Sequence, residues 1–546
     1  MENTLYYGDN LKVLREYIKD ESVDLIYLDP PFNSNRSYNV LFKDESGISS
    51  DAQITAFDDS WHWGNTAQET YNELVTKSPG NVGQLIQSLY QFIGSNQMMA
   101  YLVMMSIRLV ELHRVLRPTG SLYLHCDTTA SHYLKILLDM IFGPDNFRNE
   151  IIWKRSNPKS NITINLPNST DSILRYSKSH LCKYYQPYGE HNPEYLDKAY
   201  KYKDGKGRYR LLPLLNPNDD RPNLTYEFLG VKRVWRWTKE RMQKAYEDGL
   251  VVQLRPGAVP QYKKYLEDSK GRTITNLWDD IQQAAGNESL GYPTQKPILL
   301  LERILRISTD EGDLVLDPFS GCGTCISASQ KLGRHWIGID ITHLAIAMHK
   351  SRLKNMFGLE PKKDYRVIGE PEDLPGARQL AKDDRFQFEA WAISLVEARP
   401  MNRPTHSEPG QRDIHKGFDR GIDGIINFLD DRKGGVKKAL VQVKSGKVNS
   451  SQIRDLKGVL DREQAQIGVF IALENPSRDM ITEALTAGLY HSEIWDRDYP
   501  RIQILTIEEL LNGASVKIPQ TPSNAAAFKK AEKTDKPGPT QGGLGI

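Results

Sequence analysis

Apolar residues in this chain recur at two spacings, one typical of helices and one typical of strands. The run 23–28 is almost wholly apolar, as in a parallel strand that is covered on both faces. Further strands are predicted over 121–126, 313–317 and 335–340, and helices over 10–18, 99–116, 298–308, 325–332 and 342–355. Strands that alternate with helices in two separated stretches predict a doubly wound α/β sheet.

Two other regions follow different patterns. Residues 157–285 show weak periodicity and many basic and aromatic residues, which predicts a domain inserted between the two halves of the sheet. Another α/β pattern follows, with helices predicted over 386–398 and 450–464 and strands over 418–428, 439–448 and 467–473. The expected domains are 1–156, 157–285, 286–369 and 380–515, with a linker at 370–379 and a disordered tail at 516–546 that is rich in proline, glycine, lysine and threonine.

Composition and charge limit the kinds of binding partner and the cellular compartment that are expected for this protein. The chain has 546 residues and a net charge of +2, so a nucleic-acid surface would have to be a local patch. No apolar run reaches the roughly 18 residues of a membrane span, and the first residues lack a signal-peptide pattern. The four cysteines form no disulfide framework, and these observations together favour a cytoplasmic protein with no membrane partner.

The first candidate site follows the strand 23–28, where the chain continues as Asp29-Pro30-Pro31-Phe32. Asp29 places a carboxylate at the carboxyl end of a parallel strand, where α/β sheets bind ligands. The prolines fix the direction of the chain and leave carbonyl oxygens free to accept hydrogen bonds, and Phe32 provides a flat apolar face. Acceptors for both hydrogens of an NH₂ group, next to an aromatic ring, favour a planar substrate with an exocyclic amine. The alternative is a strand that ends at prolines beside a chance acid.

The second candidate site is the loop LDPFSGCGT, which follows a predicted strand and opens a helix. Gly321 and Gly323 allow a tight turn and the close approach of a ligand to the backbone. The next strand ends in Asp340, near the spacing at which an acid accepts hydrogen bonds from ribose hydroxyls. A simple tight turn is the alternative, while a zinc or redox site at Cys322 and Cys325 is disfavoured because there is no second cysteine pair.

Together these motifs resemble the S-adenosylmethionine-dependent amino-methyltransferases of DNA. DPPF resembles their [DNS]-P-P-[YFW] motif and LDPFSGCGT resembles their cofactor motif, and GDNLKVL, LHCD, NEIIWKR and YPTQKP are also similar to segments of this family. The order of the motifs is similar to that of the beta class, and most of all to the modification subunits of type III restriction systems. The resemblance covers about 1–357 apart from the insert.

The resemblance implies a Rossmann-like methyltransferase fold with an inserted target-recognition domain, acting on double-stranded DNA. Asp29 and the Pro30 carbonyl would hold the target amine, with Pro31 completing the motif, while Phe32 would stack on a base flipped out of the duplex. The cofactor S-adenosylmethionine would be bound by Asp9, Asn10, Thr294, Gln295, Lys296, Asp317, Phe319, Gly321, Gly323, Thr324 and Asp340. Aspartate at the first motif position favours the 6-amino group of adenine; a cytosine amino-methyltransferase is the alternative, and Asn-Pro-Pro-Tyr would be more usual for a protein substrate.

Basic residues gather in two segments of the insert. The segment 201–210 has five basic residues against one acid, and 231–244 has six against one, interleaved with Trp235 and Trp237. Basic residues mixed with aromatic ones favour contacts to DNA phosphates and bases, which agrees with the position of the target-recognition region in the beta class. A solvated charged face is the alternative.

The last α/β region carries a candidate nuclease site. Asp423, Gln442 and Lys444 occur on two predicted strands in an arrangement that can hold Mg²⁺ and orient a hydrolytic water, with Asp423 and Gln442 as the metal ligands. The order of elements resembles Mrr-like restriction endonucleases, in which a Glu on the preceding helix, here Glu389, often assists. An amphipathic hairpin, or a DNA-binding module that does not cleave, is the alternative. The motifs leave a homodimer open, and the most distant hypothesis for the whole chain is a nucleotide-binding regulator.

Overall fold

The structure, a computed structural model, describes residues 2–31, 37–43, 49–58, 63–156, 166–286, 288–290, 292, 294–401, 421–430 and 436–519. The chain divides into two compact units, one formed by Met1–Tyr185 with Asn276–Ile546 and the other by Gln186–Thr275. The second unit is shorter than the insert expected at 157–285, because the strand Thr170–Ser177 belongs to the sheet of the larger unit.

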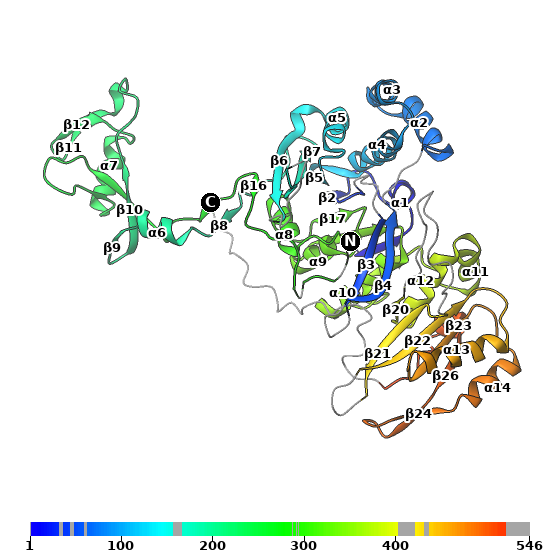
Figure 1. Cartoon of the computed structure of the whole chain (residues 1–546). Coiled ribbons are helices and arrows are strands. Elements are labelled where there is room, and N and C mark those ends of the chain that lie inside the picture. The colour runs from blue at the N-terminus through cyan, green and yellow to red at the C-terminus, as the bar shows by residue number, and fades with distance from the viewer. Residues whose placement is uncertain are drawn as a thin grey trace. The chain divides into compact units, whose positions relative to one another are not determined.

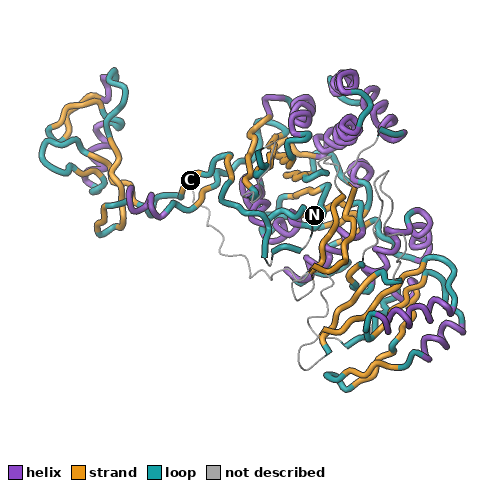
Figure 2. The backbone as a smooth tube through the Cα atoms, viewed as in Figure 1, coloured by secondary structure: helices purple, strands orange, loops and turns teal. Residues whose placement is uncertain are grey.

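A nine-stranded sheet lies in the N-terminal part of the larger unit (Figures 1 and 2). Its strands, in spatial order, are β16 (Leu277–Trp278), β6 (Phe147–Lys154), β7 (Thr170–Ser177), β5 (Leu116–Cys126), β2 (Val23–Leu28), β17 (Leu314–Asp317), β18 (His335–Asp340), β1 (Thr4–Tyr7) and β19 (Arg366–Ile368). Neighbouring strands are parallel, except that β7 runs antiparallel to β5 and β6. The predicted Rossmann-like α/β fold is confirmed.

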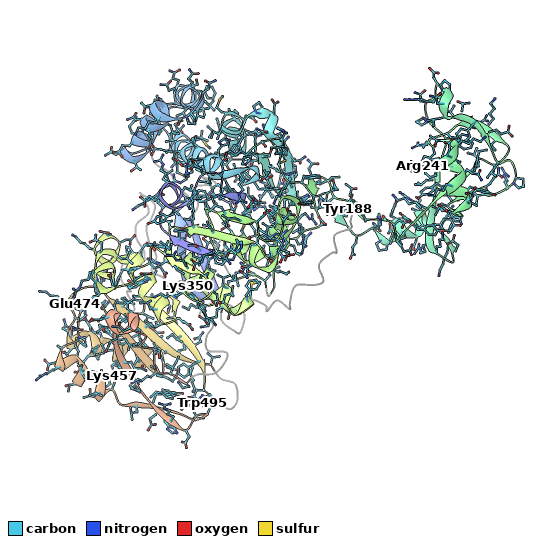
Figure 3. All side chains as sticks on the ribbon, turned by 180° about the vertical axis from the view of Figure 1, so that it is seen from behind. Tyr188, Arg241, Lys350, Lys457, Glu474 and Trp495 are labelled. Atoms are coloured by element: carbon cyan, nitrogen blue, oxygen red, sulfur yellow. The ribbon has the colours of Figure 1, made fainter. Side chains whose placement is uncertain are left out.

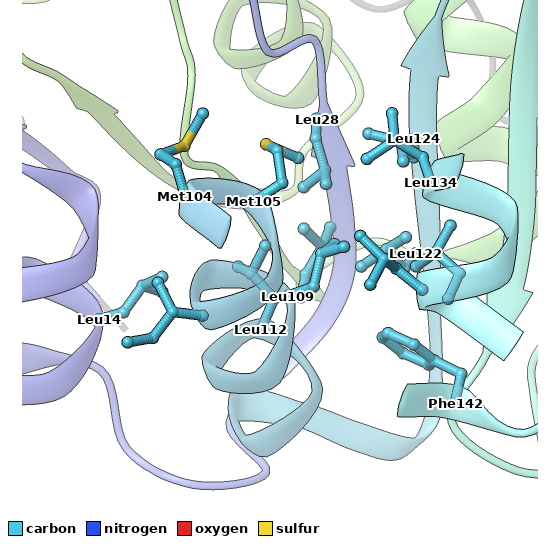
Figure 4. Packing of buried hydrophobic residues seen from close by; sticks show 14 of the residues in the cluster. Leu14, Leu28, Met104, Met105, Leu109, Leu112, Leu122, Leu124, Leu134 and Phe142 are labelled. Carbon is cyan, nitrogen blue, oxygen red and sulfur yellow. The ribbon is translucent and has the colours of Figure 1, made fainter. Parts of the chain in front are cut away.

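Helices cover both faces of this sheet. One face carries α1 (Asn10–Tyr17), α4 (Gln97–Val115) and α5 (Ser131–Phe142), and the other carries α8 (Ile298–Ser308), α9 (Thr324–Lys331) and α10 (His343–Phe357). On the first face, Met105, Leu122 and Leu134 pack in one apolar cluster (Figure 4). On the second face, Ile326 of α9 packs with Trp336 of β18. This coverage on both sides explains why β2 and β17 are buried along their whole length.

Shorter elements surround these layers. The helices α2 (Asn65–Lys77) and α3 (Val82–Ile93) contact α4, and the 3₁₀ turn η1 (Pro144–Asn146) follows α5. The strands β3 (Ser37–Lys43) and β4 (Ser49–Asp58) form an antiparallel pair of their own. In the part of the chain that the structure describes, every helix is too short or too polar to cross a membrane.

The order of strands reverses between β2 and β17. From β2 the chain continues to β5 on one side, whereas from β17 it continues to β18 on the other side. The two strands are parallel neighbours, so Asp29 after β2 and Asp317 at the end of β17 lie at the same edge of the sheet. Open α/β sheets bind ligands in the crevice at such a reversal, which places the expected site here.

The smaller unit is built from short antiparallel ladders and two helices (Figure 1). Its elements are β8 (Tyr188–Gly189), α6 (Pro193–Ala199), β9 (Tyr202–Asp204), β10 (Gly207–Pro213), η2 (Pro222–Leu224), β11 (Thr225–Phe228), β12 (Val231–Val234), α7 (Lys239–Glu247), β13 (Val251–Val252), β14 (Gln261–Tyr265) and β15 (Arg272–Thr273). Its apolar core includes Phe228, Trp235 and Met242. A core of this size suits a small domain with much exposed surface.

The C-terminal part of the larger unit contains a second, five-stranded sheet (Figure 1). Its strands, in spatial order, are β20 (Arg399–Pro400), β21 (Gly424–Leu429), β22 (Val436–Lys444), β23 (Ile467–Ala472) and β26 (Ile502–Thr506), beside a hairpin of β24 (Leu489–Ser492) and β25 (Arg497–Pro500) that carries the exposed Trp495 at its turn (Figure 3). The helices are α11 (Leu374–Asp383), α12 (Arg385–Leu395), α13 (Ser450–Arg462), α14 (Arg478–Thr486) and α15 (Ile507–Leu511). Val441 and Val443 pack with α12 on one face of the sheet, and Leu440 packs with α13 on the other.

Two segments have more structure than the sequence predicted. The helix α11 occupies most of the expected linker at 370–379, and Asp373 caps it by accepting a hydrogen bond from the backbone N–H of Gly376 at 2.7 Å. At the start of the expected tail, Val516 is buried and the backbone of Lys517 forms two hydrogen bonds with the Gln503 amide, at 2.8 and 2.7 Å. The remainder of the tail, 520–546, lies outside the described residues.

Candidate functional site

A cavity of about 360 Å³ lies at the carboxyl edge of the nine-stranded sheet. Segments that are far apart in the sequence form its wall, and they come from the ends of β2, β17 and β18, from the start of α1 and from the turn before α8. The predicted residues that line it are Asp9, Asn10, Asp29, Pro30, Pro31, Thr294, Lys296, Asp317, Phe319, Gly321, Thr324 and Asp340. The fold therefore brings most of the two predicted motifs into one site.

Asp29 has two carboxylate oxygens in different situations. The Lys296 ammonium donates a hydrogen bond to Asp29 Oδ2 at 2.5 Å and another to the Thr294 carbonyl oxygen at 3.3 Å. Asp29 Oδ1 is buried and has no hydrogen-bond partner among the described residues. One oxygen is thus fixed by a cation, and the other is ready to accept a hydrogen bond from a ligand in the cavity.

The glycine loop between β17 and α9 depends on two left-handed residues. Gly321 has φ +48° and donates its backbone N–H to Asp340 Oδ2 at 2.9 Å. Gly323 has φ +80°, and a Cβ there would lie 2.7 Å from His349 Nδ1. Burial lowers the pKa of His349 to about 3, so this imidazole is a neutral packing group. Gly321 lines the cavity, whereas Gly323 lies behind it and allows the loop to pack on α10.

The two acids beside the loop are held by backbone donors. Asp317 Oδ1 accepts from the Phe319 N–H at 3.1 Å, and burial raises the pKa of Asp317 well above its usual range. Asp340 Oδ1 accepts from the N–H and the hydroxyl of Thr342, both at 2.9 Å. Burial raises the pKa of Asp340 although these hydrogen bonds oppose the shift. A carboxylate offers about four acceptor positions, so Asp340 retains capacity for a hydroxyl donor in the cavity.

Arg108, which belongs to none of the predicted motifs, organises the wall near α1. Its Nη2 lies 2.6 Å from Asp9 Oδ2, and its Nε donates to Asn10 Oδ1 at 2.5 Å. Asn10 in turn donates from Nδ2 to the Pro318 carbonyl oxygen at 2.8 Å, which joins α1 to the loop after β17. The one signal for Arg108 in the sequence is its charge within the otherwise uncharged stretch 98–110 of α4. Its position in the cavity depends on how α4 packs, which local patterns do not predict.

Two other predicted residues differ from the cavity-lining set. Gln295 uses both ends of its amide within its own turn: its Oε1 accepts from the Leu290 N–H and its Nε2 donates to the Glu288 carbonyl oxygen, both at 2.7 Å. It therefore shapes the turn that presents Lys296. Phe32, the expected stacking residue, lies outside the described residues.

The two tryptophans of the insert that were expected to contact DNA differ in how deeply they are buried. Trp235 is fully buried in the core of the small unit, so the prediction that it packs on DNA is wrong. Trp237 is half-buried, with the Arg241 guanidinium 4.5 Å from its ring centroid (Figure 3 labels Arg241 on α7). Lys232 and Arg233 are exposed on β12, where they are accessible to an anionic partner.

The nuclease candidates lie around β22 in the C-terminal sheet. Asp423 is buried, and its Oδ2 accepts a hydrogen bond from the Val443 N–H at 2.7 Å. Gln442 and Lys444 leave the opposite face of β22 from Val443, whereas Glu389 belongs to α12, which packs on the Val443 face. Gln442 Oε1 is buried without a hydrogen-bond partner in the described part of the chain. Within those residues, no three His, Cys, Asp or Glu side chains come together as a metal site.

Comparison with known families agrees with the site in the first sheet. A family model described as DNA methylase, N6_N4_Mtase, matches residues 23–350. The chain belongs to this family of DNA methylases. The matched region contains the Asp-Pro-Pro-Phe corner, the Thr294–Lys296 turn, the glycine loop and Asp340, and the prediction of a DNA methyltransferase is confirmed.

Individual relatives come from modification enzymes. The methylase is 29% identical over 426 residues to the type II methyltransferase M.EcaI of Enterobacter cloacae, covering 76% of this chain and 84% of that protein. It is 28% identical over 351 residues to the type III restriction-modification enzyme StyLTI Mod subunit of Salmonella typhimurium, covering 60% of this chain and half of the subunit's length. The solved PvuII DNA methyltransferase (cytosine-N4-specific) is 13% identical, with a TM-score of 0.32, and the alignment covers 64% of this chain and 86% of that one.

The C-terminal domain matches a second family. Residues 411–512 match a model described as NACHT-associated inactive Restriction Endonuclease 1. A restriction-endonuclease-like domain is therefore present, as predicted. The matched family is an inactive one, so DNA cleavage and Mg²⁺ binding by Asp423, Gln442, Lys444 and Glu389 gain no support from it.

Proposed function

We propose that this methylase transfers a methyl group from S-adenosylmethionine to the exocyclic 6-amino group of adenine in DNA. The observation that carries the proposal is the Asp29 carboxylate, with Oδ2 held by Lys296 and a buried Oδ1 without a partner among the described residues. A buried acceptor without a donor costs free energy unless a ligand satisfies it, and an amine hydrogen from a substrate would do so.

The residues in the cavity fit the cofactor. Its volume of about 360 Å³ is in the range of small-molecule sites. Asp340 would accept hydrogen bonds from ribose hydroxyls, Phe319 would pack on the adenine ring, and the Asp9 and Asn10 segment would close the opposite wall. When bound, S-adenosylmethionine supplies a methyl group on a sulfonium centre, which is an electrophile that needs no further activation.

Asp29 and Pro30 would act on the nucleophile. The lone pair of an exocyclic base amine is delocalised into the ring, so the amine is a poor nucleophile in its planar form. Hydrogen bonds from its two hydrogens to Asp29 Oδ1 and to the Pro30 carbonyl oxygen favour a pyramidal nitrogen with a directed lone pair. Such bonds are strongest in the transition state, where they accelerate the reaction. A base in a duplex has to leave the stack to reach this cavity, and the proposed Phe32 contact would hold it there.

Adenine is proposed over cytosine because Asp, rather than Ser, precedes the two prolines. We expect that expression in a methylation-free bacterial host will produce N6-methyladenine at one short recognition sequence, seen by sequencing the genomic DNA for modified bases. The Asp29→Ala variant serves as the matched control and should leave the DNA unmodified. N4-methylcytosine in place of N6-methyladenine would favour the cytosine alternative, since the same carboxylate can hold that amine.

For the C-terminal domain we propose the alternative without cleavage, within a modification enzyme of a restriction–modification system. Gln442 carries no charge at the position where a carboxylate would bind Mg²⁺ most strongly, and the matched family is inactive. We expect supercoiled plasmid to stay intact with the purified protein and Mg²⁺, with or without S-adenosylmethionine. Mg²⁺-dependent nicking that disappears in Lys444→Ala would restore the nuclease hypothesis.

A further inference from the structure

Three buried side chains form a hydrogen-bonded chain that starts in the wall of the cavity. Tyr27 lines the cavity, and its hydroxyl lies 3.1 Å from Nδ1 of His125. Nε2 of His125 lies 3.1 Å from Asp171 Oδ2. Exposed fractions of 3% for Tyr27, 0% for His125 and 4% for Asp171 show that all three side chains are almost completely buried. The three residues come from β2, β5 and β7, so this series of hydrogen-bonded side chains crosses the sheet at its ligand-binding edge.

The position of Tyr27 relates this chain to the target amine. Tyr27 precedes Asp29 by two residues on an extended segment, so both side chains leave the same face of the sheet. Both residues line the cavity. His125 itself is not among the lining residues, and its contact with the Tyr27 hydroxyl connects it to the cavity wall.

The proposed methyl transfer leaves one proton without an acceptor. When the amine nitrogen forms its bond to the methyl carbon, the bond from that carbon to sulfur breaks and its electron pair stays on sulfur. The methylated nitrogen then carries a positive charge and one hydrogen too many. Asp29 is already paired with Lys296, and a proton on Asp29 would break that ion pair. A separate acceptor is therefore needed near the amine.

We propose that Tyr27, His125 and Asp171 form a proton relay that receives this hydrogen. Tyr27 Oη takes the proton from the methylated amine while its own proton passes to His125 Nδ1. His125 becomes an imidazolium that keeps its Nε2–H bonded to the Asp171 carboxylate, so charge and atoms balance. After the methylated base leaves, the proton returns through Tyr27 to water in the cavity. Tyr27 is the catalytic residue here, and His125 and Asp171 are positioning residues that act through it.

The charged groups around His125 set the resting state of the relay. Besides Tyr27 and Asp171, the charges of Lys296 and Asp29 act on His125 from the cavity side. The Arg155 Nε lies 3.3 Å from Oδ1 of Asp171. Burial, and then the charge of Lys296, lower the pKa of His125, so the ring is neutral at pH 7. Burial alone would raise the pKa of Asp171, but the bond from His125 and the charge of Arg155 hold it below its ordinary value. A neutral ring beside an ionised acid donates from Nε2 and accepts at Nδ1, which is the arrangement that the relay requires.

The relay rests on the proposed function, and its test compares two buried tyrosines. Tyr27→Phe removes the hydroxyl of the relay, whereas Tyr123→Phe removes a hydroxyl that is bonded to Ser308 at 2.6 Å and does not line the cavity. In single-turnover methylation of a saturating DNA duplex, Tyr27→Phe and His125→Gln should lose about 10²-fold in rate near pH 7, as expected for the loss of acid–base catalysis. Their rates should rise with pH, because hydroxide or buffer base must then take the proton. Tyr123→Phe should keep the rate and the pH profile of the unaltered enzyme.

Other outcomes separate the relay from the proposed function. If Tyr27→Phe and His125→Gln transferred methyl groups at the unaltered rate with an unaltered pH profile, the relay would be wrong. A drop in rate whose pH profile stayed that of the unaltered enzyme would likewise overturn it, by showing a merely structural role. Failure of the proposed function would appear differently, as no methyl transfer to DNA by the unaltered enzyme.

A measurement that does not depend on catalysis tests the same relay. Nitrogen-15 chemical shifts of His125, assigned by comparison with His125→Gln, should show a neutral ring protonated at Nε2 between pH 6 and 8. Asp171→Asn should weaken that preference, because the amide can also donate to Nε2. A ring that is charged at pH 7, or protonated at Nδ1 in the unaltered protein, would contradict the relay.

Discussion

Replacing Asp29 with alanine should lower the rate constant of methyl transfer by about 10²–10³-fold, the range seen when one preorganised group that stabilises a transition state is lost. The substitution removes the buried Oδ1 acceptor that is proposed to bind the amine, and it leaves the Lys296 ammonium without its 2.5 Å partner. Transfer of a radiolabelled methyl group to DNA in a single turnover, at saturating cofactor and DNA, measures the chemical step directly. Affinity for S-adenosylmethionine should fall much less than the rate, because Asp29 is assigned to the base and acts on the cofactor site only through Lys296.

Two further variants make this result specific. Asp29→Asn keeps the size of the side chain, but Lys296 needs an acceptor and will attract the amide oxygen, which turns the NH₂ group toward the amine. Two donors would then face each other, so this variant should also be severely impaired. Asp20→Ala removes an exposed acid that pairs with Arg114 at the surface and should stay within about twofold of the unaltered rate, because surface ion pairs contribute little. An Asp29→Ala enzyme that keeps more than a tenth of the rate would contradict the assignment.

The sequence predicted the site well where a motif follows directly from a strand. The apolar run before Asp29 requires a parallel strand buried on both faces, and such a strand ends at the ligand-binding edge of the sheet. The loop with Gly321 and Gly323 likewise lies between a strand and a helix that the periodicity predicts. In both cases the chemistry and the local structure come from the same few residues.

Residues that depend on long-range packing could not be predicted in the same way. Arg108 bonds to Asp9 and Asn10 across about a hundred residues of sequence, and His125 bonds to Tyr27 and Asp171 on neighbouring strands. These contacts follow from the order of strands and the packing of α4, which local periodicity does not encode.

The insert shows the opposite failure, in which a local pattern favoured the wrong role. A tryptophan between basic residues is typical of segments that contact nucleic acids. The small unit, however, needs large apolar side chains to form any core. Trp235 supplies that need, and its indole N–H donates to the Tyr226 carbonyl oxygen at 2.8 Å. Trp235 directly follows β12 and is fully buried, while its charged neighbours Arg233 and Arg236 remain exposed.

Gly323→Ala should destabilise the larger unit by about 2–5 kcal/mol, from a left-handed backbone conformation that costs roughly 1–2 kcal/mol and from an overpacked contact that costs about 1–3 kcal/mol. The added Cβ would lie 2.7 Å from His349 Nδ1, and that imidazole is buried and has little room to move. The strain acts on the loop that presents Gly321 to Asp340, so affinity for S-adenosylmethionine should fall at least tenfold. Chemical denaturation and titration calorimetry measure the two effects on the same protein.

Gly358→Ala is the matched control, because it separates backbone strain from the steric contact. Gly358 ends α10 with φ +71°, close to the +80° of Gly323, but a Cβ there meets nothing within 4 Å. We therefore expect only the backbone cost of about 1–2 kcal/mol and an unchanged affinity for the cofactor. Equal losses of stability and affinity in the two variants would contradict the steric argument. The contact with His349, which is present at Gly323 and absent at Gly358, would then have no measurable effect. A large loss in Gly323→Ala alone would instead show that the cofactor loop needs glycine for close packing on His349 as well as for its backbone conformation.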